Sequence, residues 1–338
     1  MKLGPLHIDG FLAAMLTAVA LALLAPEIGR SDGPLHLGPV TGVGIALVFL
    51  LHGANLAPDK LLAGMRNWRL HFFVQACTFL LFPLIGWALA KILEGHIAPA
   101  LLTGVFFLCV LPSTISSSVA FTAMAGGNVA AAVFNATLSN FIGILVTPLL
   151  VSQWLHAEGG GLPVGQAILS VSVQLLLPFV IGQFLRPHVH AWLSHHKALV
   201  NRVDRGVIVL IVYSSFSDSA AAGLWSGQGW VTVLQALGLS VAILAGVLTL
   251  TRLAARRLGF ALPDEVVAVF CGSKKSVASG IPMARLLFGT RPELGLIVLP
   301  AMLYHQVQLL VCAAMARRYA RALSASGAGQ RDAKLAGG

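Results

Sequence analysis

Two adjacent lysines are the residues of this chain best placed to do chemistry, because they lie inside a long apolar stretch. Lys274 and Lys275 fall near the middle of the predicted helix 263–288. A charge at the centre of a membrane helix costs about 2.5–3.5 kcal/mol on insertion scales, so it usually faces a cavity or a partner group. Two ammonium groups there suit the binding of an anion or the carrying of a proton. The structural alternative is a lysine that caps exposed carbonyl oxygens at a helix break.

A second polar segment interrupts another apolar stretch, the charge-free window 95–157. The interruption begins at Pro112, because proline removes a backbone donor and clashes with the preceding turn. Five of the six residues after the proline carry hydroxyl groups, which can bond the freed carbonyls or a ligand. Non-helical backbone at membrane depth survives only where it is buried in protein or lines a cavity. A merely kinked helix, with hydroxyls bonded to their own turn, is the alternative.

These two segments supply the predicted binding residues for a substrate or a coupling ion. The first segment contributes Pro112, Ser113, Thr114, Ser116, Ser117 and Ser118. The second contributes Gly272, Ser273, Lys274, Lys275 and Ser276. Polar side chains in other predicted helices are secondary candidates, and each can equally tie helices together by hydrogen bonds. They are Gln75, Asn135, Asn140 and His305, with Gln306 and Gln308 beside the last of them.

The elements that carry these segments are membrane helices. Of the 338 residues, 57% are hydrophobic and only 10% are charged, and the mean hydropathy is +0.86. A soluble domain carries about 25% charged residues, so this composition excludes a soluble enzyme, a disordered protein and a DNA-binding domain. It predicts an all-α polytopic membrane protein. The predicted spans are 8–27, 37–57, 69–93, 97–125, 128–155, 163–186, 203–224, 229–255, 263–288 and 294–318.

The positive charges predict how these ten helices are oriented. Sixteen of the 22 Lys and Arg residues fall at the termini and in the even-numbered turns, the pattern of cytoplasmic loops. Both termini are therefore expected in the cytoplasm, and the net charge of +10 is an orientation signal that does not imply nucleic acid. Short loops suit a bacterial inner (plasma) membrane. The segment 321–338 is expected to be a disordered cytoplasmic tail.

The two polar breaks occupy corresponding places in two halves of the chain. Residues 1–157 and 158–320 each hold five predicted helices, and the break lies in the fourth helix of each half. Repeats with an odd number of helices insert with opposite orientations. Paired interruptions in inverted repeats point to the transport site of a secondary transporter.

At these breaks the chain resembles the bile acid:sodium symporter superfamily, and within it the branch of SBF-like, cation/proton-antiporter-like transporters. The resemblance rests on His52-Gly53-Ala54-Asn55-Leu56, the run Leu111–Pro148 with its Gly126-Gly127-Asn128-Val129-Ala130 turn, and Cys271–Ala284. It implies a panel domain of helices one, two, six and seven and a core domain of the others. The unwound fourth and ninth helices would cross in the core, and the two domains would move by alternating access. His52 and Asp218 fall on panel helices, and Asp218 is expected at the membrane interface.

The coupling ion is where this chain departs from its sodium-coupled relatives. Hard cations take oxygen ligands. The resemblance implies that such ligands would stand at Ala132 and Ala136, near Phe270 and at Lys274, whereas Ser117 and Ser118 do match. We therefore expect sodium coupling to be absent or altered and the substrate to be a small organic anion. The choice between a proton and sodium as the coupling ion stays open.

No cofactor and no metal site are expected, and the four cysteines are expected to be buried and unpaired.

Two other classes of function compete with transport. One is a regulator or receptor that keeps the transporter fold without transport. The other is an intramembrane hydrolase with a Ser–Lys pair, although the neighbours Ser273 and Lys274 would not face each other on a helix. We assign no catalytic residues. The lipid bilayer and a small organic anion are the expected partners, and the oligomeric state is left open.

Overall fold

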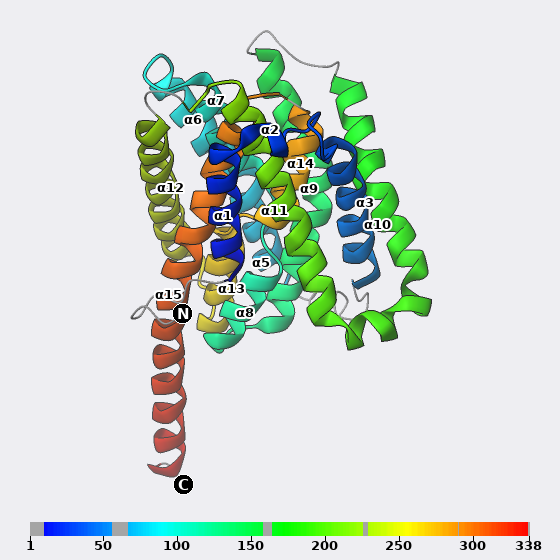
Figure 1. The fold of residues 1–338 in the computed structure, drawn as a ribbon. Coiled ribbons are helices and arrows are strands. Elements are labelled where there is room, and N and C mark those ends of the chain that lie inside the picture. The colour runs from blue at the N-terminus through cyan, green and yellow to red at the C-terminus, as the bar shows by residue number, and fades with distance from the viewer. Residues whose placement is uncertain (1–9, 56–66, 158–163, 226–228, 290, 337–338) are drawn as a thin grey trace.

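The computed structural model describes residues 10–55, 67–157, 164–225, 229–289 and 291–336, and within these ranges the regular structure is entirely helical. The first half holds α1 (Gly10–Leu24), α2 (Pro26–Gly29), α3 (Leu37–Asn55), α5 (Trp68–Ala76), the π-helix η1 (Cys77–Leu81), α6 (Phe82–Leu93), α7 (Pro99–Val110), α8 (Ser116–Met124) and α9 (Val129–Ala157). The second half holds α10 (Val164–His195), α11 (Lys197–Ala221), α12 (Gly229–Arg257), α13 (Leu262–Gly272), α14 (Val277–Phe288) and α15 (Leu294–Ala336). Figure 1 shows this order along the chain.

Each of the ten predicted spans coincides with one helix or with a consecutive set of helices. Among the described residues, five helices are long and apolar enough to cross a membrane by themselves: Leu37–Asn55, Trp68–Leu93, Val129–Leu155, Gly229–Arg257 and Leu294–Ser324. α7 and α13 are shorter because the predicted breaks end them early. An integral membrane protein follows from these apolar helices, whereas ten crossings stay a prediction.

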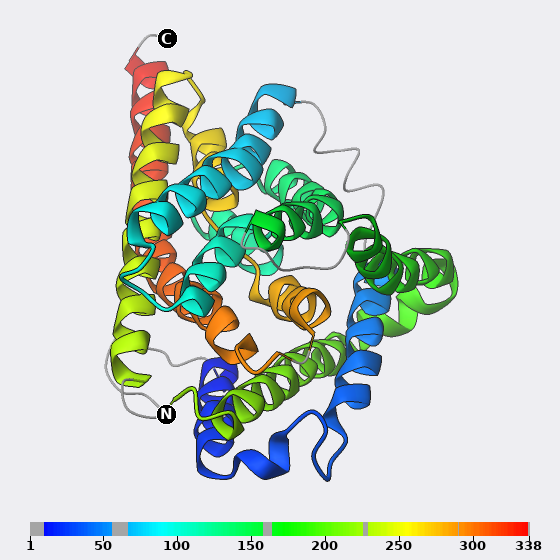
Figure 2. The same cartoon turned by 90° about the horizontal axis from the view of Figure 1, so that it is seen from above.

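The helices associate in two groups. α3 packs along α10, α1 packs along α11, and α11 also contacts α3. Seen from above, these four helices and the short α2 lie together on one side of the molecule, and the remaining helices lie on the other (Figure 2). We call the first set the α3–α10 group and the second the central group. The α3–α10 group contains the helices that the resemblance assigns to a panel domain.

Small residues bring α3 and α10 into close contact. A Cβ atom added to Gly53 would lie 2.0 Å from the carbonyl oxygen of Phe179. A Cβ added to Gly182 would lie 2.1 Å from the carbonyl oxygen of Leu50. The backbones therefore approach each other at both glycines, as small residues allow in membrane helices. Gly53 belongs to the His52–Leu56 motif, which gives that part of the motif a packing reason.

The central group is built around the two short half-helices before the breaks. Every residue from Leu101 to Val110 in α7 is buried, and so is every residue from Glu265 to Gly272 in α13. Because these residues are buried on every side of the helix, other protein surrounds them. The ends of α7 and α13 therefore lie in the interior, and the non-helical residues 111–114 and 273–276 that follow them are buried as well.

The last helix is longer than the sequence pattern indicates. α15 continues to Ala336 and extends well beyond the other helices (Figure 1). Residues 321–336 are part of this helix, whereas the disorder expected from composition for the segment 321–338 stays a prediction. Alanine and arginine are favourable helix formers, and the segment follows a buried helix that supplies the first turns.

Candidate functional site

The first predicted break is a real interruption of the backbone. α7 ends at Val110, and the capping residue Leu111 has extended backbone angles of −66° and 151°. Pro112 follows within a non-helical segment, and the chain becomes helical again at Ser116. The alternative of a continuous, kinked helix is therefore wrong for this structure. Gly143 of α9 faces the proline, because a Cβ there would lie 2.8 Å from its Cβ.

The second break interrupts the backbone in the same way. α13 ends at Gly272, and helix resumes at Val277. Ser276 caps the new helix, since its Oγ accepts a hydrogen bond from the Ser279 N–H at 3.2 Å. Gly272 itself is closely packed, because a Cβ there would lie 3.3 Å from the Cβ of Cys77.

The two breaks are in contact and satisfy each other's backbone groups. Ser113 donates its hydroxyl to the carbonyl oxygen of Cys271 at 2.7 Å. In return, the backbone N–H of Ser276 donates to the carbonyl oxygen of Pro112 at 2.9 Å. Ser118 adds a bond of 3.3 Å to the carbonyl oxygen of Phe270. The structure therefore brings the two predicted segments together, although they lie about 160 residues apart in the sequence.

Lys275 is held at this crossing by carbonyl oxygens. Its ammonium group donates to the carbonyl oxygens of Leu111 at 2.7 Å, Cys109 at 2.8 Å and Thr78 at 3.0 Å. The ring of Phe82 lies on another side, with its centroid 4.0 Å from Nζ. An ammonium group has three N–H donors, so all three of them are satisfied. Lys275 thus caps the end of α7, which is the structural role considered for one of the lysines.

Lys274 is placed differently. Its ammonium group donates to the carbonyl oxygen of Ser117 in α8 at 2.9 Å. The ring centroids of Phe121 and Phe270 lie 4.0 and 5.2 Å from Nζ. This hydrogen bond and two cation–π contacts hold the charge, and they leave N–H capacity that Lys275 does not have. Both lysine residues are at most 1% exposed.

The predicted hydroxyl residues divide into two kinds. The hydroxyls of Ser113 and Ser118 bond across the crossing. The hydroxyl of Ser276 instead caps α14, and the hydroxyl of Ser273 donates to the carbonyl oxygen of Val269 at 2.6 Å. Thr114 and Ser117 share a hydrogen bond of 2.6 Å between their hydroxyls. Ser116 is exposed, as is its neighbour Ile115. Within the first segment, the residues open to a ligand are therefore those around Ser116 and Ser117.

Among the secondary candidates, Asn140 joins the two breaks directly. Its amide nitrogen donates to the carbonyl oxygen of Ser113 at 2.9 Å, and its oxygen accepts from the Ser279 hydroxyl at 2.7 Å. Asn135 instead bonds to Gln75 and His71 in α5, a buried contact between helices.

His305 contacts the lysine segment through Gln308. The Gln308 amide nitrogen lies 2.9 Å from His305 Nδ1 and donates to the carbonyl oxygen of Lys275 at 2.9 Å. Its amide oxygen accepts from the Lys275 backbone N–H at 3.0 Å. Two other participants, Thr78 and Tyr304, were not singled out in the sequence. Tyr304 donates to the carbonyl oxygen of Ser273 at 2.6 Å, and an aromatic residue in an apolar helix carries no signal for that role.

The geometry gives no support to a Ser–Lys dyad. Both lysine ammonium groups donate to main-chain carbonyls, and the Ser273 hydroxyl bonds within its own helix. A nucleophilic serine needs a base within hydrogen-bond reach of its hydroxyl. Within the described residues, no group of three or more His, Cys, Asp or Glu side chains could hold a metal ion. The cysteines are free thiols, all buried: Cys77, Cys109, Cys271 and Cys312.

Two charged or polar residues of the α3–α10 group also have partners. His52 Nε2 lies 3.4 Å from Asp204 Oδ1 in α11. Asp218, expected at the membrane interface, lies in the last turn of α11 with 9% of its side chain exposed. It accepts hydrogen bonds from the backbone N–H and the hydroxyl of Ser31, at 2.9 and 3.2 Å. Arg285 of α14 lies on its other side.

This architecture of buried, interrupted and crossing helices is that of a membrane transporter, and comparison with known proteins gives the family. The model of the SBF-like CPA transporter family matches residues 9–321, so the chain belongs to this family. The uncharacterized protein PA2026 of Pseudomonas aeruginosa is 48% identical, over 93% of each chain. The putative symporter YfeH of Escherichia coli is 43% identical, again over 93% of each chain. The sodium/bile acid cotransporter 7 of Danio rerio is 32% identical, over 90% of this chain and 91% of that protein.

Proposed function

We propose that this protein is a secondary active transporter that moves a small organic anion across the membrane by alternating access. The observation that carries the proposal is Lys274. It is a buried cation at the contact between two interrupted helices, and its bond to Ser117 places it beside the exposed Ser116. Unwound backbone and buried charge meet at the substrate sites of transporters. The family, and relatives named as a symporter and as a sodium/bile acid cotransporter, support the same conclusion.

The substrate in this proposal is an organic anion of the bile-acid or carboxylic-acid type. A site with two lysines and no carboxylate in its contacts favours a negatively charged ligand. At an effective dielectric constant of about 20, unit charges about 4 Å apart interact by about 4 kcal/mol. Because Lys275 already has three carbonyl partners, we assign the contact with the anion to Lys274 and to the hydroxyls around Ser116.

Sodium coupling in this proposal is absent or altered. The positions where the resemblance implies ligand-bearing residues hold Ala132, Ala136 and Phe270, whose side chains are fully buried and carry no oxygen. Lys275 meets three carbonyl oxygens with a fixed positive charge, which is what a bound cation would otherwise contribute. The lysines therefore replace the ion permanently, or Lys274 carries a coupled proton.

The proposed topology follows the charge pattern. Residues 1–157 and 158–320 form two inverted five-helix repeats, with α1, α3, α10 and α11 in the panel and the other helices in the core. Both termini face the cytoplasm of a bacterial cell, with the protein in the inner membrane. A fluorescent protein fused after Gly338 fluoresces in this topology, and a secreted phosphatase fused there is inactive. Active phosphatase at the C-terminus would contradict the orientation.

A binding screen followed by flux tests the function. Taurocholate and a set of mono- and dicarboxylic acids are screened for thermal stabilisation of the purified protein, with and without sodium and across pH. Uptake of the stabilising compound is then measured in proteoliposomes. We expect Lys274→Met to lower uptake at least about tenfold and Lys91→Met, which removes an exposed lysine of α6, to leave it unchanged. Binding without flux would favour the receptor-like alternative, and uptake that depends steeply on sodium would contradict the coupling proposal.

A further inference from the structure

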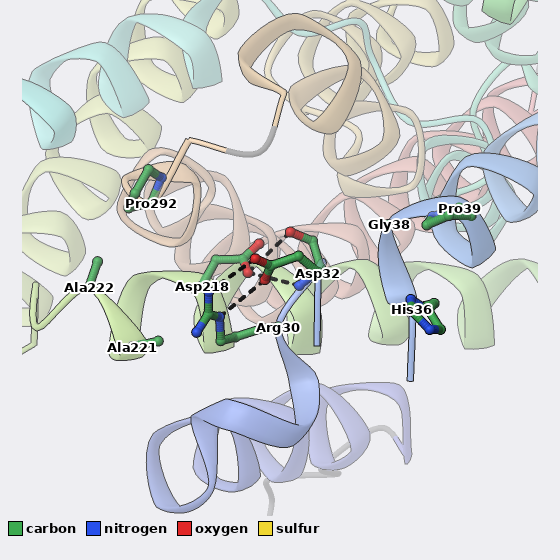
Figure 3. Close-up of a pocket in the computed structure, with 10 residues that line it drawn as sticks. Arg30, Asp32, His36, Gly38, Pro39, Asp218, Ala221, Ala222 and Pro292 are labelled. Atoms are coloured by element: carbon green, nitrogen blue, oxygen red, sulfur yellow. Dashed lines mark hydrogen bonds and ion pairs between the residues drawn. The ribbon is translucent and has the colours of Figure 1, made fainter. Parts of the chain in front are cut away.

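A second polar contact joins the two groups of helices, between α11 and the last turn of α14. It lies at the end of the molecule that carries the connections 30–36, 94–98, 222–225 and 291–293, which we call the outer end. Figure 3 shows the region, where Asp218 of α11 faces the connection between α2 and α3 and lies near Pro292 before α15. Residues of all three segments line a pocket of about 630 Å³.

Asp218 links the two groups through its two carboxylate oxygens. Oδ1 accepts both hydrogen bonds from Ser31, which belongs to the same α3–α10 group as α11. Oδ2 faces the other way, and Nη1 of Arg285 in α14 lies 3.6 Å from it. Both side chains are less than 10% exposed. Ser31 therefore holds the carboxylate in place, and the ion pair with Arg285 crosses between the groups.

The next residue of α11 makes a second contact across the same boundary. The hydroxyl of Ser219 donates to the carbonyl oxygen of Pro292 and accepts from the backbone N–H of Gly295 at 3.1 Å. The fit is close, because a Cβ added to Gly295 would lie 2.5 Å from Ser219 Oγ. Asp218 and Ser219, which are adjacent in α11, therefore contact α14 and the start of α15.

We propose that Asp218 and Arg285 form an outer gate, an ion pair that holds the two groups together while the outer end is closed and that separates when it opens. The inference rests on the proposed transport cycle, in which the groups move relative to each other. A buried ion pair is a suitable two-state element. Removing one partner of such a pair strongly destabilises the protein, because the other charge stays buried without a partner. The intact pair nevertheless contributes little net stability, because both charges are desolvated. The pair therefore fixes a closed arrangement without making it irreversible.

The gate is tested by the accessibility of a buried cysteine, which needs no known substrate. Ser215 lies in the same contact and is fully buried, its hydroxyl lacks a hydrogen-bond partner, and its carbonyl oxygen would lie 3.2 Å from a Cβ at Gly295. Ser215→Cys is therefore a conservative reporter. Ser217→Cys is the matched control, because Ser217 is equally buried but faces Gly29 within the α3–α10 group. The four native cysteines are buried, and the parent chain measures their background.

Intact cells are labelled with a membrane-impermeant maleimide. We expect Asp218→Asn and Arg285→Gln each to raise the labelling rate of Ser215→Cys at least about tenfold. The variant with both changes should raise this rate little beyond either single change. The amide in Asp218→Asn keeps an oxygen that can accept from Ser31, so a merely local structural role predicts no such increase. Gly295→Ala, which leaves both charges intact, is expected to raise labelling as well, because its methyl group collides with Ser219.

Two outcomes would overturn the gate. One is a labelling rate of Ser215→Cys that, in both charge variants, stays within about twofold of its rate with Asp218 and Arg285 intact. The other is an equal increase for Ser217→Cys, which would indicate general loosening. The test is independent of transport: if the labelling responds as expected while no anion is carried in proteoliposomes, the gate stands and the proposed function fails.

Discussion

The ammonium group of Lys275 lies 2.7 Å from the carbonyl oxygen of Leu111, the residue that caps the end of α7. A helix leaves its last carbonyl groups without intrahelical partners. Here a side chain from the other break supplies the missing donors, since the same ammonium group also reaches Cys109 and Thr78. The second interrupted helix therefore stabilises the end of the first, and the crossing is a single structural unit.

Removing this cap should destabilise the whole protein. In Lys275→Met the methionine has a similar length, but three buried carbonyl oxygens lose their donor. Each unsatisfied buried group costs about 1–3 kcal/mol, so we expect a loss of at least about 3 kcal/mol. The measurement is the thermal unfolding midpoint in detergent, followed by tryptophan fluorescence. An unchanged midpoint would show that Lys275 is not the cap.

Removing Lys274 should affect ligand binding more than stability. Lys274→Met loses one hydrogen bond and two aromatic contacts, which together contribute about 1–3 kcal/mol. We expect the unfolding midpoint to fall less than in Lys275→Met. Thermal stabilisation by the bound anion should disappear in Lys274→Met and persist, relative to its own lower baseline, in Lys275→Met. If Lys274→Met lowers the unfolding midpoint more and Lys275→Met abolishes stabilisation by the anion, the roles assigned to the two lysines must be exchanged.

The sequence predicted where the helices break, but not which groups satisfy the breaks. Proline, glycine and hydroxyl residues are local signals, and they located both interruptions and the two lysines. The partners of Lys275 come from η1 and α7, more than 160 residues earlier, and no local pattern distinguishes its ammonium group from that of Lys274. The contacts of Asp218 with Ser31 and Arg285 could not be predicted for the same reason.

Asn140 should be needed to hold the two breaks together. Asn140→Ala leaves the Ser113 carbonyl and the Ser279 hydroxyl without this partner, and we expect a loss of about 2 kcal/mol. Asn55→Ala is the matched control, because Asn55 is exposed and bonds to Leu51 in its own helix. The two variants are compared by unfolding midpoint in the same detergent. Equal midpoints would contradict a bridging role for Asn140.

The close contact of α3 with α10 should tolerate no side chain at Gly53. In Gly53→Ala the added methyl group would meet the carbonyl oxygen of Phe179 at 2.0 Å, so the helices must separate or the backbone must shift. Overpacking of this kind costs about 1–3 kcal/mol. Gly42→Ala on the same helix is the control: its Cβ has no neighbour within 4 Å, and alanine should be neutral or stabilise the helix by about 0.5–1 kcal/mol. Gly182→Ala should repeat the effect of Gly53→Ala from the α10 side. If Gly42→Ala and Gly53→Ala shift the unfolding midpoint equally, the glycine contact does not determine the packing of this group.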